Sequence, residues 1–401
     1  MSEPIKKSVL CDLVTRHSDF DFDRFLAETP SEDYDHWNGF CLPMDYGDAE
    51  LEYHAIRNSC ALFDASPMKK YRFRGKDAGA FLDRILTTPV SALPDMKGGY
   101  GLLCNEDGYL LDDGITLKFS GEDYLLLISE IEMDEHFAQY HDFSDLTISE
   151  ETPLTAGVAL QGPRSCEVLS QMGFDGVEAL APFELRHWTI SGHEILVGRL
   201  GFTGDLGYEV WFATEATDVV TRALEGVEAK LGLQIPGYGL SAVQVARLEA
   251  GMIVPGWDTA GEFEDPALER TPYELNLGWN VRLKRDEAFV GKDALKQHKV
   301  NGPRFRLKGF VVDSPCFLED GETLFIKVEG KSEKIGHLNS VAWHTDKKYW
   351  IGFASVEAPH AKLESAFILN EGRDLAVQFC KLPFIDLARR QQVPAPLGGS
   401  A

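Results

Sequence analysis

The sequence is short of basic residues. Its 39 Lys and Arg stand against 64 Asp and Glu, which gives a formal net charge of -25 at pH 7. Such an excess of acid argues against nucleic acid and against an anionic membrane as partners, because both repel a negative surface. The seven cysteines are scattered and form no Cys-x-x-Cys pair. We therefore expect free thiols in a reducing compartment rather than a disulfide framework.

Long hydrophobic runs are missing as well. No run approaches the length of a membrane span, and the start, Met1-Ser2-Glu3-Pro4, has no basic-then-apolar signal region. We expect a cytoplasmic protein. Since no His, Cys and carboxylate cluster has the spacing of metal ligands, we expect no metal. A serine nucleophile elbow and a Gly-Lys-Ser/Thr phosphate loop are absent too.

What the sequence does contain is a pair of adjacent carboxylates, Asp112 and Asp113, between a glycine-containing turn and an alternating apolar run. The pattern predicts strand, turn, strand. Neighbouring strand residues point to opposite faces, so only one of the two aspartates faces inward. An inward carboxylate is costly unless it has a partner or a task. Tyr100 faces this pair if the hairpin forms, although a lone tyrosine is more often a packing residue.

A second motif, residues 201–209, holds three glycines in seven positions and ends at Glu209. It predicts either a tight turn between strands or a loop whose backbone approaches a flat ligand closely. Arg247 and Glu249 lie on a predicted helix, residues 240–250, where they form a salt-bridged helix surface, orient a ligand or tie two domains together.

The order of predicted elements suggests the architecture. Two blocks alternate strands and helices, with Asp77 and Thr214 as expected helix N-caps. From residue 305 onward the pattern is short strands with turn signals, which predicts a barrel or sandwich. The last residues, 392–401, are rich in Pro and Gly and are expected to be disordered.

Taken together, several segments resemble the folate-dependent aminomethyltransferase superfamily. This family includes the glycine-cleavage T-protein, the dimethylsulfoniopropionate demethylase and the aryl O-demethylases. The resemblance covers about residues 37–383. The matching segments are residues 63–68, Tyr100, Asp112 and Asp113, and residues 161–163, 201–209, 247–251, 272–274 and 289–295.

Some positions depart from the family pattern. Val243 stands where glycine-cleavage enzymes have an arginine that helps hold the folate, and Pro67 replaces a histidine. Ser129 replaces an asparagine, as it does in the sulfonium demethylase. Residues 338–344 replace a barrel motif. These departures favour another donor over the glycine-cleavage role while leaving the folate chemistry in place.

The resemblance implies an α+β fold, a three-domain cloverleaf of two ferredoxin-like α+β units and a C-terminal β-barrel. It implies a discontinuous folate-binding domain of residues 1–60 and 153–290. The second α+β domain is expected at residues 61–152, with the paired aspartates, and the barrel at residues 300–390.

The resemblance also implies roles for individual residues. Asp113 and Tyr100 are the expected catalytic residues: Asp113 manages proton and charge beside folate N5, and Tyr100 shapes the donor side. The cofactor is tetrahydrofolate, with Glu209 as the pterin anchor. The expected folate-binding set is Glu209, Phe202, Met68, Ser129, Asp113 and Arg247, and the expected substrate contacts are Trp257 and Trp343.

For function, we favour a tetrahydrofolate-dependent methyltransferase, or demethylase, that takes a one-carbon group from a small N-, O- or S-methyl metabolite. The alternative is the aminomethyltransferase (T-protein) of the glycine cleavage system, whose donor is carried on a lipoyl carrier protein. A third possibility is a folate-binding protein without transfer activity, such as the iron–sulfur assembly factors. Residues 251–257 lack the Cys of their motif.

Overall fold

The computed structural model describes residues 5–29, 36–129, 132–259 and 266–393. Its first sheet is antiparallel, with strand order β10-β11-β12-β9-β3. The strands are β3 (Ala61–Asp64), β9 (Thr155–Gln161), β10 (Leu185–Ile190), β11 (His193–Gly198) and β12 (Gly207–Ala213). One face packs against α1 (Cys11–Thr15), α6 (Ser165–Gln171) and α7 (Thr217–Leu231), which bury their apolar sides on it.

The second sheet is also antiparallel, with order β5-β6-β7-β4-β8. Its strands are β4 (Lys69–Arg74), β5 (Lys97–Cys104), β6 (Leu110–Ser120), β7 (Asp123–Ile128) and β8 (Thr147–Glu150). On one face lie α4 (Ala78–Ile85) and α5 (Asp134–Tyr140), packed through a core of aromatic and aliphatic side chains. This unit carries the paired aspartates.

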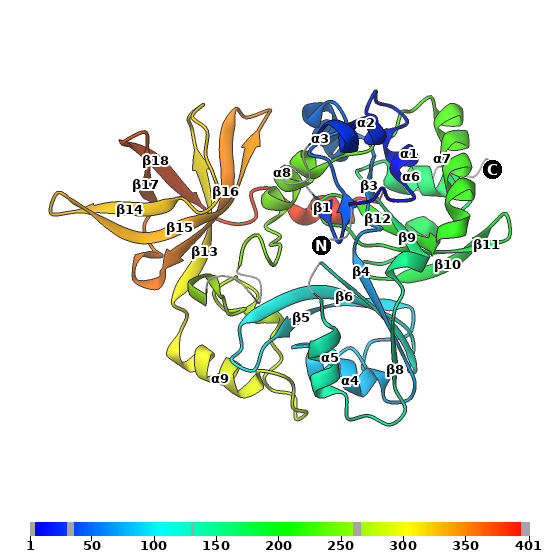
Figure 1. Ribbon diagram of the computed structural model, residues 1–401, viewed down its shortest axis with the longest axis horizontal. Coiled ribbons are helices and arrows are strands. Elements are labelled where there is room, and N and C mark those ends of the chain that lie inside the picture. Colours follow the sequence, from blue (N-terminus) through cyan, green and yellow to red (C-terminus); the bar gives the residue numbers. More distant parts are fainter. Residues whose placement is uncertain (1–4, 30–35, 130–131, 260–265, 394–401) are drawn as a thin grey trace.

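The C-terminal strands close into a barrel in the order β13-β16-β15-β14-β17-β18. They are β13 (Phe305–Val312), β14 (Thr323–Val328), β15 (Lys331–His344), β16 (Tyr349–Glu357), β17 (Ser365–Asn370) and β18 (Arg373–Cys380). Figure 1 shows the barrel to one side of the two α+β sheets. The expected α+β fold with a C-terminal β-barrel is thus confirmed.

The remaining elements link these units. They are α2 (Phe22–Glu28), β1 (His36–Trp37), β2 (Phe40–Cys41), α3 (Ala49–Asn58), α8 (Leu240–Ala250) and α9 (Lys292–Asn301), together with short 3-10 turns. The helix α8 touches α3, β15 and β16, and it lies between the barrel and the first sheet in Figure 1. The helix α8 therefore connects the barrel to the α+β part of the protein.

Two clusters of apolar side chains make the contacts between units. One fills the space between the free faces of the two sheets and includes Leu117 and Leu127 from the second sheet and Leu196 and Trp211 from the first. The other surrounds α8 and reaches α3, β5 and the barrel. Burial of this much apolar surface holds the three units in one arrangement.

Most predicted helices begin and end near the expected residues, because their apolar spacing is regular. One prediction is wrong: Thr214 does not cap α7. A 3-10 turn, Thr214–Ala216, precedes the helix, and Thr217 is its first residue. Asp77 occupies the N-cap position of α4, but its carboxylate accepts a hydrogen bond from Asp145 N instead of capping the helix. None of the seven cysteines, all within the described residues, forms a disulfide in the structure; residues 394–401, expected to be disordered, lie outside the described part.

Candidate active site between the two sheets

A β-bulge sets the direction of the paired aspartates. The register of β5 and β6 shifts between Leu103 and Cys104, so Leu111 is the extra residue on β6. After it, Asp112 lies opposite Leu103 and Asp113 opposite Leu102. Bulges re-aim side chains in this way and are common beside active sites. Asp112 is completely buried and accepts a hydrogen bond from Asp113 N at 2.8 Å, whereas Asp113 is only partly buried.

Asp113 has a close partner on the neighbouring strand. The Tyr100 hydroxyl donates to Asp113 Oδ2 across 2.5 Å, at the short end of the range for a hydroxyl that donates to a charged carboxylate. Burial raises the pKa of Asp113 to about 6, the Tyr100 hydrogen bond opposes this rise, and the charge of Asp258 adds to it. A carboxyl group with such a pKa exchanges its proton near neutral pH, as acid–base catalysis requires.

An indole ring continues this site toward the surface. Trp279 stacks on Tyr100 with ring centroids 6.0 Å apart and planes at 24°, and 60% of Trp279 is exposed. The next residue, Asn280, fixes the arrangement by donating to Tyr100 O at 2.9 Å. Sequence reasoning missed both residues. The only signal for Trp279 is an aromatic residue in a polar, turn-rich segment.

The second carboxylate, Glu209, projects from β12 into the space between the sheets. It shares a face of the strand with Trp211, which packs there beside Ile115. Ile115 in turn shares a face of β6 with Asp113. Strand alternation therefore directs Glu209 and Asp113 into the same space between the sheets, from opposite sides. The sequence placed both on strands without revealing that the strands face each other.

Glu209 is unusual because its buried Oε2 has no hydrogen-bond partner among the described residues. Burial raises the pKa of Glu209 to about 7. The Trp211 indole N–H, which lies close by but makes no hydrogen bond of normal geometry, offsets part of the rise. A buried carboxylate oxygen without a donor is costly, and such positions in native proteins call for an explanation. The arrangement suits a ligand that brings N–H donors.

Aromatic side chains form a wall between the two carboxylates. Phe63 stacks on Tyr238 at 5.2 Å, and Trp37 packs on Phe63 at 6.1 Å. Tyr100 belongs to the same apolar cluster. Burial raises the pKa of Tyr238, and the charge of Glu209, which acts on this ring, raises it further. The wall therefore extends from the Asp113 end of the site to the Glu209 end.

Of the other predicted folate contacts, Ser129 and Met68 lie near this wall. Ser129 O accepts hydrogen bonds from Trp37 Nε1 at 2.9 Å and from Asn38 Nδ2 at 3.0 Å. Met68 packs in the cluster between the sheets. Its backbone is held by Lys70, a fully buried residue whose Nζ donates to Met68 O at 2.8 Å. Burial lowers the pKa of Lys70 to about 7.

Phe202 lies in the glycine-rich loop between β11 and β12 and is 38% exposed. The segment after β18 holds this loop in place. Gly204 has a φ of +82°, and a Cβ there would come within 2.9 Å of Ile385 Cδ1. On the same segment, Arg389 Nε pairs with Asp205 at 2.6 Å. The glycine is thus required by close approach and by a left-handed backbone.

Arg247 and Glu249, predicted as a possible pair, bind different partners. Arg247 is fully buried, and its Nη1 pairs with Asp258 Oδ2 at 2.5 Å. Its buried Nη2 has no hydrogen-bond partner among the described residues. Trp257 lies over the guanidinium at 5.9 Å and is 45% exposed. Arg247 is therefore held by Asp258, a residue whose charge also raises the pKa of Asp113.

Glu249 is the centre of a buried polar network. It accepts hydrogen bonds from Arg57 Nη2 at 2.7 Å and from Tyr53 OH at 2.9 Å, and His344 Nε2 lies 3.1 Å from its Oε1. Arg57 also pairs with Asp205. Burial alone would raise the pKa of Glu249, but His344 and Arg57 outweigh it and hold the pKa at about 2. The network joins α3, α8, the glycine-rich loop and the barrel, as one interpretation of the sequence proposed.

Trp343, the other predicted substrate contact, lies on the barrel. It pairs with Trp350 across β15 and β16, with ring centroids 5.5 Å apart. Its neighbours Ala342 and His344 point to the opposite face of the strand, toward α8. The structure therefore does not bring Trp343 into the group formed by Tyr100, Asp113 and Glu209.

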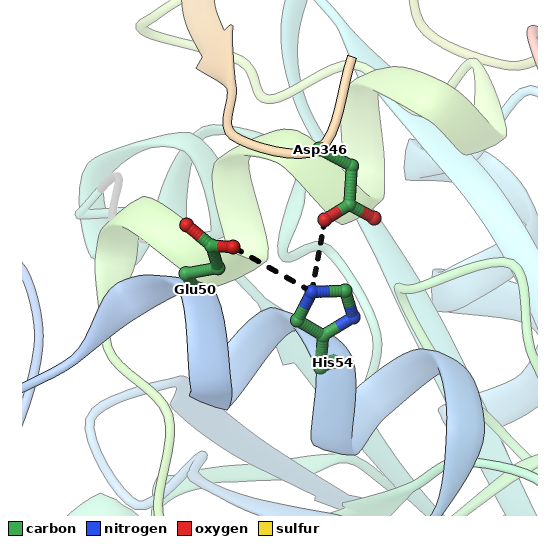
Figure 2. Close-up of side chains that lie close together, drawn as sticks. All are labelled: Glu50, His54 and Asp346. Atoms are coloured by element: carbon green, nitrogen blue, oxygen red, sulfur yellow. Dashed lines mark ion pairs between the residues drawn. The ribbon is translucent and has the colours of Figure 1, made fainter. Parts of the chain in front are cut away.

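One surface group offers the atom types of a metal site, although the sequence predicted no metal. Glu50, His54 and Asp346 present ligand atoms within 4.8 Å of one another (Figure 2). His54 Nε2 lies 2.8 Å from Asp346 and 3.9 Å from Glu50, and Lys348 lies 3.8 Å from Glu50. These contacts are those of an exposed ion-pair cluster that links α3 to the turn after β15, and such clusters add little stability.

Known proteins show clear similarity to this chain. The model of the GCVT N-terminal domain family matches residues 34–285. An aminomethyltransferase of Thermotoga maritima is 32% identical over 71% of this chain and 78% of its own. One from Bacillus pumilus is 32% identical over 82% and 87% of the two chains, and one from Rubrobacter xylanophilus is 30% identical over 90% and 92%.

A solved structure is similar throughout. The glycine cleavage system aminomethyltransferase T from Bartonella henselae has a TM-score of 0.78 and 22% identity, over 95% of this chain and 98% of its own. At this identity the likeness concerns the fold. The described helices include none with both the length and the apolar character that a membrane crossing requires.

The chain belongs to the aminomethyltransferase family defined by the GCVT N-terminal domain. The resemblance read from its motifs is thereby confirmed, as is the expectation of an enzyme that transfers one-carbon groups. The roles of individual residues stay predictions, and the geometry above is the basis for them.

Proposed function

We propose that this chain is a tetrahydrofolate-dependent aminomethyltransferase, with the one-carbon unit transferred in the space between the two sheets. This was the alternative in the sequence analysis. The names of the relatives support it over the methyl transfer that the departures from the family motifs favoured. The observation that carries the folate proposal is the buried Oε2 of Glu209 without a partner.

The residues present fit a folate. A pterin ring carries an amino group and a ring N–H, which match the two oxygens of one carboxylate as a bidentate pair. The stacked rings of Phe63 and Tyr238 offer a flat apolar surface beside that carboxylate. When bound, tetrahydrofolate supplies N5 as the nucleophile for the one-carbon unit.

In the mechanism that we propose, Asp113 holds or accepts a proton at Oδ1 or Oδ2 during the transfer and balances positive charge at the reacting nitrogen. The Tyr100 hydroxyl keeps this carboxylate in one position and favours its charged form. Glu209 fixes the pterin, and the aromatic wall excludes water, so that the Asp113 charge acts at low dielectric.

The donor distinguishes the candidate functions. For the aminomethyltransferase we propose a donor group carried on a lipoyl-bearing carrier protein. Methyl transfer from a small N-, O- or S-methyl metabolite is the second candidate. The observation that favours it is Val243 on α8, at the position where glycine-cleavage enzymes have an arginine. Neither candidate calls for nucleic acid or a membrane as partner.

The test is an assay with tetrahydrofolate and two donor types, an aminomethyl-loaded lipoyl carrier and a panel of methyl metabolites. The aminomethyltransferase predicts 5,10-methylene-tetrahydrofolate from the carrier. 5-Methyl-tetrahydrofolate from a metabolite identifies the methyltransferase instead. If neither product forms while folate binds, transfer activity is excluded and the chain is a binding protein.

We also propose the domain division given by the sequence: residues 1–60 with 153–290, residues 61–152, and residues 300–390. The contact that bears on the first boundary is the pairing of β3 with β9. Because β3 (Ala61–Asp64) belongs to the first sheet, a domain boundary after residue 60 separates this strand from its own sheet. A boundary after Asp64 keeps both sheets whole.

A further inference from the structure

Tyr100, whose hydroxyl donates to Asp113, lies on β5, and β5 is an edge strand of the second sheet. An edge strand has a neighbouring strand on one side only, so its outer backbone groups need other partners. Gly98 and Leu102, whose backbones face the same edge, hydrogen-bond to backbone groups outside the sheet. At Tyr100 the partner is a side chain, because Asn280 Nδ2 donates to Tyr100 O at 2.9 Å. The edge at Tyr100 therefore depends on one residue of a distant segment.

Asn280 is itself held firmly. It is 2% exposed, and its Oδ1 accepts from Thr87 Oγ1 at 3.1 Å and from Thr88 Oγ1 at 2.9 Å. The backbone continues this contact, since Arg282 N donates to Thr87 O at 3.1 Å. A buried polar network whose members are hydrogen-bonded favours a single geometry. The segment that carries Asn280 is therefore fixed at the point where it meets Tyr100.

A second contact holds the ring of Tyr100. The Trp279 indole stacks on this ring with centroids 6.0 Å apart and planes at 24°. Because 60% of Trp279 is exposed, burial in a core does not account for its place. The preceding residue, Gly278, leaves no space for a side chain, since a Cβ there would come within 2.8 Å of the Tyr273 ring. Tyr100 is thus held at its ring, at its carbonyl and, through Asp113, at its hydroxyl.

We propose that Asn280 and Trp279 are positioning residues for the transfer reaction, which they serve by holding Tyr100 where its hydroxyl reaches Asp113. The inference rests on the proposed function, because there Tyr100 and Asp113 handle the proton. Both positioning residues act through Tyr100. Since a misplacement of about 1 Å can cost a factor of about 10² in rate, a loosened edge strand at this position slows the reaction even with both catalytic side chains present.

Other charged groups also surround Asp113. Asp112 precedes it on β6, and Glu209 faces the same space from the first sheet. Asp258, which is paired with Arg247, raises the pKa of Asp113 further. Substitutions at positions 279 and 280 leave all of these groups in place. Because the phenol hydrogen bond opposes the effect of burial, its loss in such variants appears as a rise in the pKa of Asp113 above about 6.

The test measures the proton affinity of Asp113 in the full chain in two ways. One is the acid limb of kcat/KM with tetrahydrofolate and an aminomethyl-loaded lipoyl carrier. The other is a ¹³C NMR titration of carboxyl-labelled aspartate without ligands, in which the Asp113 signal is the one missing from Asp113→Asn. In Asn280→Leu and Trp279→Leu we expect the pKa of Asp113 to rise, as in Tyr100→Phe, and kcat near neutral pH to fall roughly ten- to a hundredfold.

Three further variants separate positioning from stability. Trp279→Phe keeps a ring on Tyr100 and should recover most of the kcat lost in Trp279→Leu. Val377→Ala removes methyl groups from the barrel core and should lower Tm without moving the pKa of Asp113. In Tyr100→Phe/Asn280→Leu the pKa of Asp113 should rise no further than in Tyr100→Phe, because the second substitution has no phenol hydrogen bond left to loosen.

The outcomes separate the two proposals. If the wild type forms no product, or if Asp113→Asn keeps its turnover, the proposed function is wrong and the NMR titration alone decides whether Asn280 and Trp279 position Tyr100. A wild-type pKa of Asp113 in both Asn280→Leu and Trp279→Leu overturns the inference, and so does a further rise in the double variant. If Asn280→Leu does not fold, Trp279→Leu decides, because its site is exposed.

Discussion

Tyr100 and Asp113 are held on neighbouring strands so that the phenol donates to the carboxylate across 2.5 Å. This hydrogen bond opposes the effect of burial, which raises the pKa of Asp113 to about 6. Asp113 is therefore charged at neutral pH and protonated in mild acid. The pair defines both where the proton is handled and the pH range in which this occurs.

Replacing Tyr100 by Phe removes the donor that favours the carboxylate. The pKa of Asp113 should rise further above its ordinary value of 3.8, because burial is then unopposed. We expect the acid limb of the kcat/KM profile, near pH 6 in the wild type, to move to higher pH. An unshifted limb in a variant that still turns over would place the titrating group elsewhere.

Replacing Asp113 by Asn removes the proton acceptor while keeping the shape of the side chain. Turnover should fall by about 10²- to 10⁴-fold, the usual contribution of a positioned acid–base group. Folate affinity, measured by equilibrium binding, should change much less. Wild-type turnover in Asp113→Asn contradicts the assignment of Asp113.

Replacing Glu209 by Gln should weaken folate binding and should stabilise the folded protein at alkaline pH. Burial raises the pKa of Glu209 from 4.5 to about 7, so the native state binds the proton more tightly than the unfolded state. Its stabilising effect is full below about pH 4.5 and is lost as the pH rises through 7. Relative to the wild type, Glu209→Gln should gain roughly 1–3 kcal/mol at pH 8 and little at pH 4.5, while folate affinity falls.

The measurement for Glu209→Gln is a pair of thermal scans at the two pH values, with folate titration as the companion experiment. A variant that binds folate as tightly as the wild type contradicts the role of Glu209. Equal Tm values at pH 8 would instead show that Glu209 is not destabilising when charged.

Replacing Arg57 by Met leaves Glu249 buried without its arginine. Breaking a buried ion pair from one side costs about 3–5 kcal/mol, which urea unfolding measures. The low pKa of Glu249 means that its contribution is present above about pH 4.5 and is lost as the pH falls through about 2. The surface variant Lys296→Met should cost less than about 1 kcal/mol; a similar loss in both variants would argue against a special role for the network.

Elements with regular spacing could be predicted from the sequence. The helix α8 was expected over residues 240–250 and has these bounds, because its ends are marked by glycines and its interior is uninterrupted. The strands around Asp112 and Asp113 were visible in the alternation of residues 110–117. Local pattern was sufficient there, since each element depends on contacts within a few residues.

Contacts between distant segments could not be predicted in this way. The proximity of Asp258 to Asp113, the stacking of Trp279 on Tyr100, and the pairing of Arg57 with Glu249 join residues more than 100 positions apart. The sequence also gives no signal for the bulge at Leu111, because an extra residue in a strand cannot be distinguished from its neighbours by residue type. Packing between the units determines these features, and one sequence holds no record of it.

The segment that pairs Arg389 with Asp205 and packs on Gly204 also bears on the timing of assembly. A chain emerging from the ribosome completes both sheets before this segment has been synthesised. Until the barrel is finished and its last residues turn back, the glycine-rich loop beside Glu209 lacks its final anchor. Folate binding should therefore appear late in biogenesis, and a nascent chain cut just before residue 382 should fold most of its sheets yet bind the pterin poorly.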